Sequence, residues 1–162
     1  RQEFDIKPGE YVCIHPGARD ERRRWSPENF AHIADKIINS GLKVVLTGSA
    51  SEAEVVGKVE SAMCHPAINL SGKTELGVLA ALIENSRLLV CNDTGVSHIA
   101  AAVGAPSVVV FLASDPRRWA PFNRELHHVI LPSEAVSIGG VFSGVKQKLL
   151  DEKFNKKSLR VA

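Results

Sequence analysis

Apolar runs without polar alternation, each followed by an amphipathic stretch, are the feature that most constrains the fold of this chain. Such runs occupy residues 11–15, 43–46, 67–70, 87–91 and 107–112, and a shorter strand is expected at 128–131. Strands that are apolar on both sides are buried on both faces, which is typical of parallel sheets covered by helices. The sequence therefore predicts an α/β fold of the doubly wound type, with a mainly parallel sheet of about six strands.

Capping signals mark the helices between these strands. Ser26, Pro27 and Glu28 supply an N-cap, a proline in the first turn and an acidic residue beside it, and Gly41 is suited to end that helix. We expect a second helix over 52–63, a third that begins at 74–75, and a fourth that runs from 93–95 to Gly104. Each helix would connect one strand to the next.

The length of 162 residues allows one domain. We place a body at residues 1–140 and a basic, helical C-terminal tail at 141–162 that packs on the body through Val145, Leu149 and Phe154. The chain starts at Arg1 and its only methionine is Met63, so we expect a longer parent protein. The longest apolar stretch, 99–113, is interrupted and shorter than the roughly 20 residues that span a bilayer, so no transmembrane helix is expected.

Cysteine usage and charge exclude several classes of protein. Cys13, Cys64 and Cys91 are odd in number and lack C-x-x-C spacing, and Cys13 and Cys91 lie in buried strands. Core thiols of this kind indicate a cytoplasmic location. The chain has no basic face interleaved with aromatic residues, so nucleic acid is not an expected partner.

Known catalytic and cofactor motifs are absent or incomplete. Residues 71–74 read Ser-Gly-Lys-Thr, but a P-loop would require a glycine where Ala67 stands. The dinucleotide fingerprint G-x-G-x-x-G, the H-E-x-x-H zinc motif, zinc-spaced cysteines and histidines, and G-x-S-x-G do not occur. We therefore expect neither a metal nor a cofactor.

The first strand-to-helix connection, residues 15–25, carries Arg19, Arg22, Arg23 and Arg24 close to a helix N-terminus. Positive side chains are unfavourable there because the helix dipole is already positive, so the loop is suited to an anion such as a diphosphate. The alternative is a solvated loop whose acidic residues neutralise part of the charge.

The fourth connection, residues 92–98, places Asp93, Thr94 and Gly95 at the end of a strand and His98 in the first turn of a helix. Backbone amides there could bind phosphate oxygens, and Asp93 could accept hydrogen bonds from sugar hydroxyls. In the alternative interpretation, Asp93 or Thr94 only caps the helix and His98 is an ordinary histidine.

Five segments in order carry a resemblance to a known family. They are His-Pro-Gly-Ala at 15–18, Arg-Arg-Trp at 23–25 with Pro-Glu-Asn-Phe at 27–30, Val-Val-Leu-Thr-Gly-Ser at 44–49 with Glu52, Asn-Asp-Thr-Gly at 92–95 with His98, and Ser-Asp-Pro at 114–116. Over about residues 11–131 the chain resembles the C-terminal half of the family 9 glycosyltransferases, the ADP-heptose:lipopolysaccharide heptosyltransferases and their relatives.

The resemblance implies the donor half of a two-domain GT-B enzyme, with residues 1–140 as a Rossmann-like, nucleotide-sugar-binding domain. The parent would transfer heptose, with inversion, from an ADP-sugar to a lipid-linked saccharide of the lipopolysaccharide core, in the cytoplasm and with peripheral membrane association. The acceptor and the catalytic base would belong to the N-terminal half, so no catalytic residue is expected here. A non-catalytic nucleotide-binding or interaction domain, or another GT-B nucleotide-sugar enzyme such as an epimerase, is the alternative.

The resemblance also implies a set of binding residues. Ser26 is an insertion relative to the family's Trp-Pro pair, which leaves open which of Arg22, Arg23 and Arg24 contacts phosphate. Leu112 stands where the family commonly has a glycine before the Ser-Asp-Pro segment. The expected donor contacts are Gly17, Ala18, Arg23, Arg24, Thr94, Gly95, Val96 and His98 for the phosphates, Asp93 for the sugar, and Gly48, Ser49, Glu52, Lys73 and Thr74 for the ribose and base.

Overall fold

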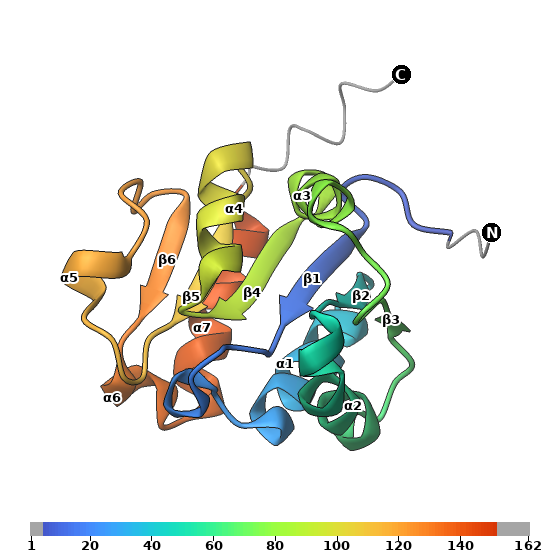
Figure 1. Ribbon diagram of the computed structural model, residues 1–162, viewed down its shortest axis with the longest axis horizontal. Coiled ribbons are helices and arrows are strands. Elements are labelled where there is room, and N and C mark those ends of the chain that lie inside the picture. Colours follow the sequence, from blue (N-terminus) through green and yellow to red (C-terminus); the bar gives the residue numbers. More distant parts are fainter. Residues whose placement is uncertain (1–4, 152–162) are drawn as a thin grey trace.

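The computed structural model describes residues 5–151 and is built on one six-stranded sheet in which every neighbouring pair of strands is parallel (Figure 1). The strand order is β3-β2-β1-β4-β5-β6, the doubly wound order of dinucleotide-binding folds. The predicted fold class is confirmed. The strands are β1 (Tyr11–His15), β2 (Lys43–Leu46), β3 (Ile68–Asn69), β4 (Leu88–Asn92), β5 (Ser107–Val110) and β6 (His127–Ile130).

Helices cover both faces of the sheet. One face is packed by α1 (Pro27–Asn39), α2 (Ala53–Ala62) and α7 (Ile138–Leu150), and the other by α3 (Leu76–Asn85) and α4 (Gly95–Val103). The N-cap of α1 is as predicted, because Ser26 Oγ accepts a hydrogen bond from the Asn29 N–H at 3.2 Å. The remaining helical turns are η1 (Glu21–Arg23), η2 (Ala50–Glu52), α5 (Pro116–Trp119) and α6 (Pro132–Ala135).

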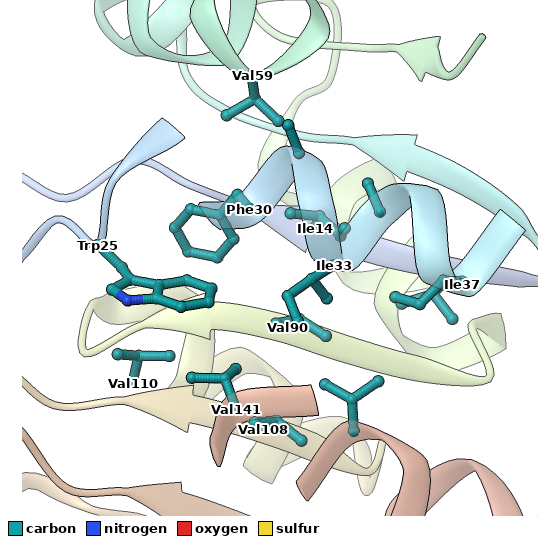
Figure 2. Packing of buried hydrophobic residues seen from close by; sticks show 14 of the residues in the cluster. Ile14, Trp25, Phe30, Ile33, Ile37, Val59, Val90, Val108, Val110 and Val141 are labelled. Atoms are coloured by element: carbon teal, nitrogen blue, oxygen red, sulfur yellow. The ribbon is translucent and has the colours of Figure 1, made fainter. Parts of the chain in front are cut away.

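Two hydrophobic layers follow from the alternation of side chains along the buried strands. On β1, Val12 and Ile14 face the α1, α2 and α7 layer, and Tyr11 and Cys13 face the α3 and α4 layer. Figure 2 shows the first layer, in which aliphatic side chains of the strands meet those of α1 and α7. A strand with both faces buried must be apolar throughout, which is why the sequence lacked polar alternation.

The boundaries differ from the expected ones in places. The third strand is limited to Ile68–Asn69, where 67–70 was expected, and β6 begins one residue before the expected range of 128–131. The short helices α5 and α6 were not predicted because four-residue helices carry too little periodicity to be recognised. Asp115 caps α5 and Pro116 opens it, which is a signal the sequence did contain.

The C-terminal helix α7 begins at Ile138, ahead of the expected tail boundary at 141. Val141 and Val145 are fully buried in the layer shared with α1, so this helix belongs to the core. Phe154 and the rest of 152–162 lie outside the described residues, and a basic tail over 141–162 stays a prediction. Among the helices within 5–151, none combines the length and apolar character that crossing a bilayer requires.

Candidate functional site

The candidate site lies where the chain changes direction across the sheet, at the carboxyl ends of β1 and β4. These two strands are adjacent, with His15 opposite Cys91. The chain leaves β1 toward α1 on one face and leaves β4 toward α4 on the other. A crevice between diverging connections of this kind is where ligands bind in open α/β sheets.

The buried side chain of Asn92 fixes the loop after β1 to the end of β4. Its Oδ1 accepts a hydrogen bond from the Trp25 N–H at 2.9 Å, and its Nδ2 donates to the Pro16 carbonyl at 2.8 Å. The Trp25 indole donates to the Ala135 carbonyl at 2.9 Å and its ring packs edge-on against Phe30 (Figure 2). Sequence reasoning gave Asn92 no role, although an amide that ends an apolar strand was a usable signal.

The three arginines of η1 and its C-cap have different partners. Arg22 pairs with Asp20 at 2.7 Å on the exposed side of the loop. Arg24 donates from Nε to the Ala18 carbonyl at 2.8 Å. Arg23 Nη1 lies 3.9 Å from Asp93 Oδ2, so this guanidinium is the one that faces the switch point between β1 and β4.

Asp93 connects three strand-to-helix loops. Its side chain is almost completely buried, and its Oδ2 accepts a hydrogen bond from the Ser114 hydroxyl in the loop after β5. It does not cap α4: the N-cap position is Thr94, whose side chain makes no capping hydrogen bond. Thr94 thus occupies the N-cap position, as the capping alternative has it, but without a capping hydrogen bond from its side chain. Ser114 was recognised as part of a motif but not expected to contact Asp93.

The N-terminus of α4 points its first backbone amides at the same end of the sheet. Gly95 begins this helix, Val96 and Ser97 are buried, and the Ser97 hydroxyl donates to the Thr94 carbonyl at 2.8 Å. His98 is exposed in the first turn. The first amides of a helix lack intrahelical acceptors and carry the positive end of its dipole, so the end of α4 is suited to a phosphate group.

A second group of side chains surrounds Glu52 at the end of β2. Its Oε2 accepts hydrogen bonds from the Ser49 N–H at 2.8 Å and the Ser49 hydroxyl at 2.9 Å, and lies 3.4 Å from His15 Nε2. His15 Nδ1 is 3.1 Å from Thr47 Oγ1. The hydrogen bond from His15, followed by those from Ser49, outweighs burial and lowers the pKa of Glu52 to about 2. Glu52 is therefore ionised at neutral pH.

Two glycines allow close packing beside Glu52. A Cβ at Gly48 would lie 2.8 Å from Val56 Cγ2, so the glycine lets α2 approach the end of β2. Gly72 has a φ of +68°, and its N–H donates to the Gly48 carbonyl at 2.8 Å, which ties the turn after β3 to the turn after β2. Lys73 and Thr74 follow on this turn, and the exposed Lys73 donates to the Asn69 carbonyl at 3.1 Å.

A cavity of about 430 Å³ lies next to the loop after β1, between the start of α1 and α2. Among the residues expected to contact the nucleotide-sugar donor, only Arg24 lines this cavity. The charged side chains of the lining are paired, Glu54 with Lys58 at 2.8 Å and Arg24 with Glu21 at 3.5 Å. The cavity is therefore separate from the Arg23–Asp93 pair. Within residues 5–151, no cluster of three or more metal-ligating side chains is found.

The comparisons with known proteins agree with one another. The family model of glycosyltransferase family 9 (heptosyltransferase) matches residues 1–138. Lipopolysaccharide heptosyltransferase 2 of Salmonella typhimurium is 32% identical over 146 residues, which cover 84% of this chain and 41% of that protein. Lipooligosaccharide heptosyltransferase 2 of Haemophilus influenzae is 31% identical over 144 residues, which cover 84% and 42%. The chain thus spans about two fifths of the length of these curated relatives.

Solved structures give the same result. ADP-heptose lps heptosyltransferase II of Escherichia coli matches with a TM-score of 0.82 and 26% identity, over 94% of this chain and 49% of that one. An Escherichia coli heptosyltransferase solved with ADP has a TM-score of 0.79 at 20% identity, over 90% of this chain and 46% of that one, which is a likeness of fold. The matched segments and the doubly wound sheet lead to one conclusion: the chain belongs to glycosyltransferase family 9, the heptosyltransferase family.

Proposed function

We propose that this chain is the donor-binding half of an inverting glycosyltransferase that transfers heptose from ADP-heptose to a saccharide of the lipopolysaccharide core. The observation that carries the proposal is the Arg23–Asp93 pair, 3.9 Å apart, between the carboxyl ends of β1 and β4 and beside the N-terminus of α4. A cation, a buried carboxylate and free helix amides in one crevice are the groups that a diphosphate linked to a sugar requires.

The phosphate side of this site is assigned to Arg23 and to the α4 N-terminus. Arg24 is engaged by the Ala18 carbonyl and by Glu21, so we propose that it holds the loop and that Arg23 contacts the diphosphate. Fixed positive groups at that position would stabilise the charge that develops on the departing diphosphate. The proposed phosphate contacts are Gly17, Ala18, Arg23, Thr94, Gly95, Val96 and His98.

The sugar and nucleoside ends are assigned on either side of the phosphates. Asp93 is buried and held by Ser114, and its carboxylate can accept hydrogen bonds from hydroxyl groups of the heptose. Glu52 can do the same for the ribose. We propose that Gly48, Ser49, Lys73 and Thr74, in the two turns joined through Gly72 and Gly48, border the ribose and the base.

The length that the chain covers supports a division of labour between two parts of the protein. It spans about two fifths of its curated relatives, and we propose that the other part of the protein binds the acceptor and supplies the base that activates its hydroxyl. This chain alone should then bind ADP and ADP-heptose without turnover. A cytoplasmic location and a peripheral contact with the membrane stay predictions for the whole protein.

A thermal-shift panel of ADP, UDP, GDP and CDP against this chain tests the proposal. A ligand that binds only the folded state raises the apparent stability, so ADP is expected to raise the melting temperature most. Stabilisation by UDP alone would favour another GT-B nucleotide-sugar enzyme, such as an epimerase. A flat response to all four nucleotides would favour a non-catalytic interaction domain.

A further inference from the structure

We propose that His15 is a positioning residue that aims the Glu52 carboxylate at the ribose hydroxyls of the bound nucleotide, an inference that rests on the proposed function. His15 is the last residue of β1 and Glu52 ends η2, so the contact joins the first and second strand-to-helix connections. No role was predicted for His15 from the sequence, although it begins the His-Pro-Gly-Ala segment.

The contacts of Glu52 are one-sided. Within residues 5–151, its hydrogen bonds and its ion pair all involve Oε2, which faces the Ser49 N–H and hydroxyl and His15 Nε2. Its side chain is 15% exposed. The groups that hold Oε2 therefore also set the direction in which Oε1 points.

Gly17 holds the same carboxylate from the other side. A Cβ on Gly17 would lie 2.3 Å from Glu52 Oε1 and 2.4 Å from Glu52 Cδ, distances that no side chain could accept without displacing the carboxylate. The loop proposed to face the phosphates thus packs directly on the acid proposed to face the ribose. The backbone of Gly17 and the imidazole of His15 thus both pack against the carboxylate of Glu52.

The proton on His15 is placed by its neighbours. An Nε2 without a proton would turn a lone pair toward an ionised carboxylate, so Nε2 carries the proton and donates to Glu52. The Thr47 hydroxyl lies 3.1 Å from Nδ1 and can donate to it, which leaves Nε2 to carry the ring proton that faces Glu52.

The consequence is a preference for a nucleotide with ribose hydroxyls. A hydrogen bond from a ribose hydroxyl to a charged, oriented carboxylate raises the affinity for the nucleotide by about tenfold or more. If the carboxylate is free to rotate, much of this gain in affinity is lost. The measurable quantity is the ratio of the dissociation constants of 2′,3′-dideoxy-ADP and ADP, because these ligands share the base and the diphosphate and differ only in the hydroxyls.

Two substitutions at His15 separate positioning from packing. Asparagine places its amide near the position of Nδ1, so His15→Asn keeps a partner for Thr47 and loses the donor to Glu52. Glutamine reaches the position of Nε2, so His15→Gln keeps that donor. We expect calorimetric titration to give a ratio of about ten for the unaltered chain and His15→Gln, and about two or less for His15→Asn.

A matched control comes from the other end of the sheet. His127 on β6 is also buried and its Nδ1 also meets a hydroxyl on the neighbouring strand, Ser107 Oγ at 2.8 Å. His127→Asn should leave the ratio unchanged. Gly17→Ala, which pushes against Glu52 without touching the imidazole, should also lower the ratio. If His15→Asn fails to fold, folded His15→Gln decides the question, because it keeps the donor at the position of Nε2.

The outcomes keep the two proposals apart. A chain that binds no ADP contradicts the proposed donor site itself. ADP binding with a ratio near one in the unaltered chain contradicts a ribose contact by Glu52, and with it the role of His15. If ADP is preferred and folded His15→Asn retains the full ratio, or folded His15→Gln loses it, the donor at the position of Nε2 does not aim Glu52 and the inference is wrong.

Discussion

The guanidinium of Arg23 lies 3.9 Å from the buried carboxylate of Asp93, although the two residues come from the first and fourth strand-to-helix connections. The parallel pairing of β1 with β4 brings these connections together, because the carboxyl ends of adjacent parallel strands share one edge of the sheet. The cation proposed to bind the phosphates and the acid proposed to bind the sugar are thus neighbours. This fits a ligand in which the sugar is bonded directly to the diphosphate.

Replacing Arg23 tests the phosphate assignment. Arg23→Ala removes a charge-assisted contact with an anion, which contributes about 1.5 to 3 kcal/mol, so the affinities for ADP and ADP-heptose should fall together by about ten- to a hundredfold. Arg22→Ala is the matched control, because Arg22 is paired with Asp20 on the exposed side of the loop. Calorimetry with both ligands is the measurement, and equal losses in both variants would contradict the choice of Arg23.

Replacing Asp93 tests the sugar assignment. Asp93→Ala should weaken ADP-heptose and spare ADP, which has no heptose to hold. It should also strengthen ADP slightly, because a carboxylate is removed from the neighbourhood of the diphosphate. Titration of both ligands distinguishes the cases: an equal loss of ADP and ADP-heptose affinity would remove Asp93 from the sugar site. Ser114→Ala, which takes away the hydroxyl partner of Asp93, should show a weaker form of the same selectivity.

Asn92 should matter for stability more than for binding chemistry. Asn92→Ala leaves the Trp25 N–H and the Pro16 carbonyl without their buried partner, and each lost partner costs about 1 to 3 kcal/mol in the free energy of unfolding. Asn92→Asp keeps an acceptor for the Trp25 N–H, but it places a buried carboxylate against the Pro16 carbonyl and next to Asp93. Urea denaturation should therefore rank both variants below the unaltered chain. A loss below about 0.5 kcal/mol in Asn92→Ala would show that the loop after β1 is held by other contacts.

His127 should make the fold sensitive to mild acid. Its burial, and then the charge of Lys148, lower its pKa to about 4 from an ordinary value near 6.5. Between these values the unfolded chain binds a proton that the folded chain does not, so the stability that is present at pH 7.5 is lost as the pH falls through 6.5 toward 4. At pH 4.5 the loss from this residue approaches about 2 kcal/mol.

The corresponding measurement compares the chain with His127→Asn in urea at pH 7.5 and pH 4.5. Because the variant lacks the titrating group, its deficit in unfolding free energy should shrink by about 2 kcal/mol at the lower pH. A deficit that is the same at both values would mean that His127 titrates alike in the folded and unfolded chain.

Local signals in the sequence were sufficient for the fold. Buried parallel strands must be apolar on both faces, and Ser26, Pro27 and Gly41 act on the backbone of their own helix, so neither signal depends on distant residues. Because every parallel strand ends at the same edge, the sequence also indicated which turns would carry a site. The choice of Asp93 as a central residue followed from its place in such a turn.

The tertiary structure alone decided which side chains meet. Arg22, Arg23 and Arg24 are consecutive in the sequence. The course of the backbone through η1 determines that Arg24 donates to the Ala18 carbonyl and that Arg23 lies beside Asp93. The contacts of Asn92 with Trp25, of Ser114 with Asp93 and of His15 with Glu52 each join separate connections of the sheet. Such pairs depend on the order of the strands and on packing distances of a few ångströms. Both are properties of the whole fold, and no single segment of the sequence encodes them.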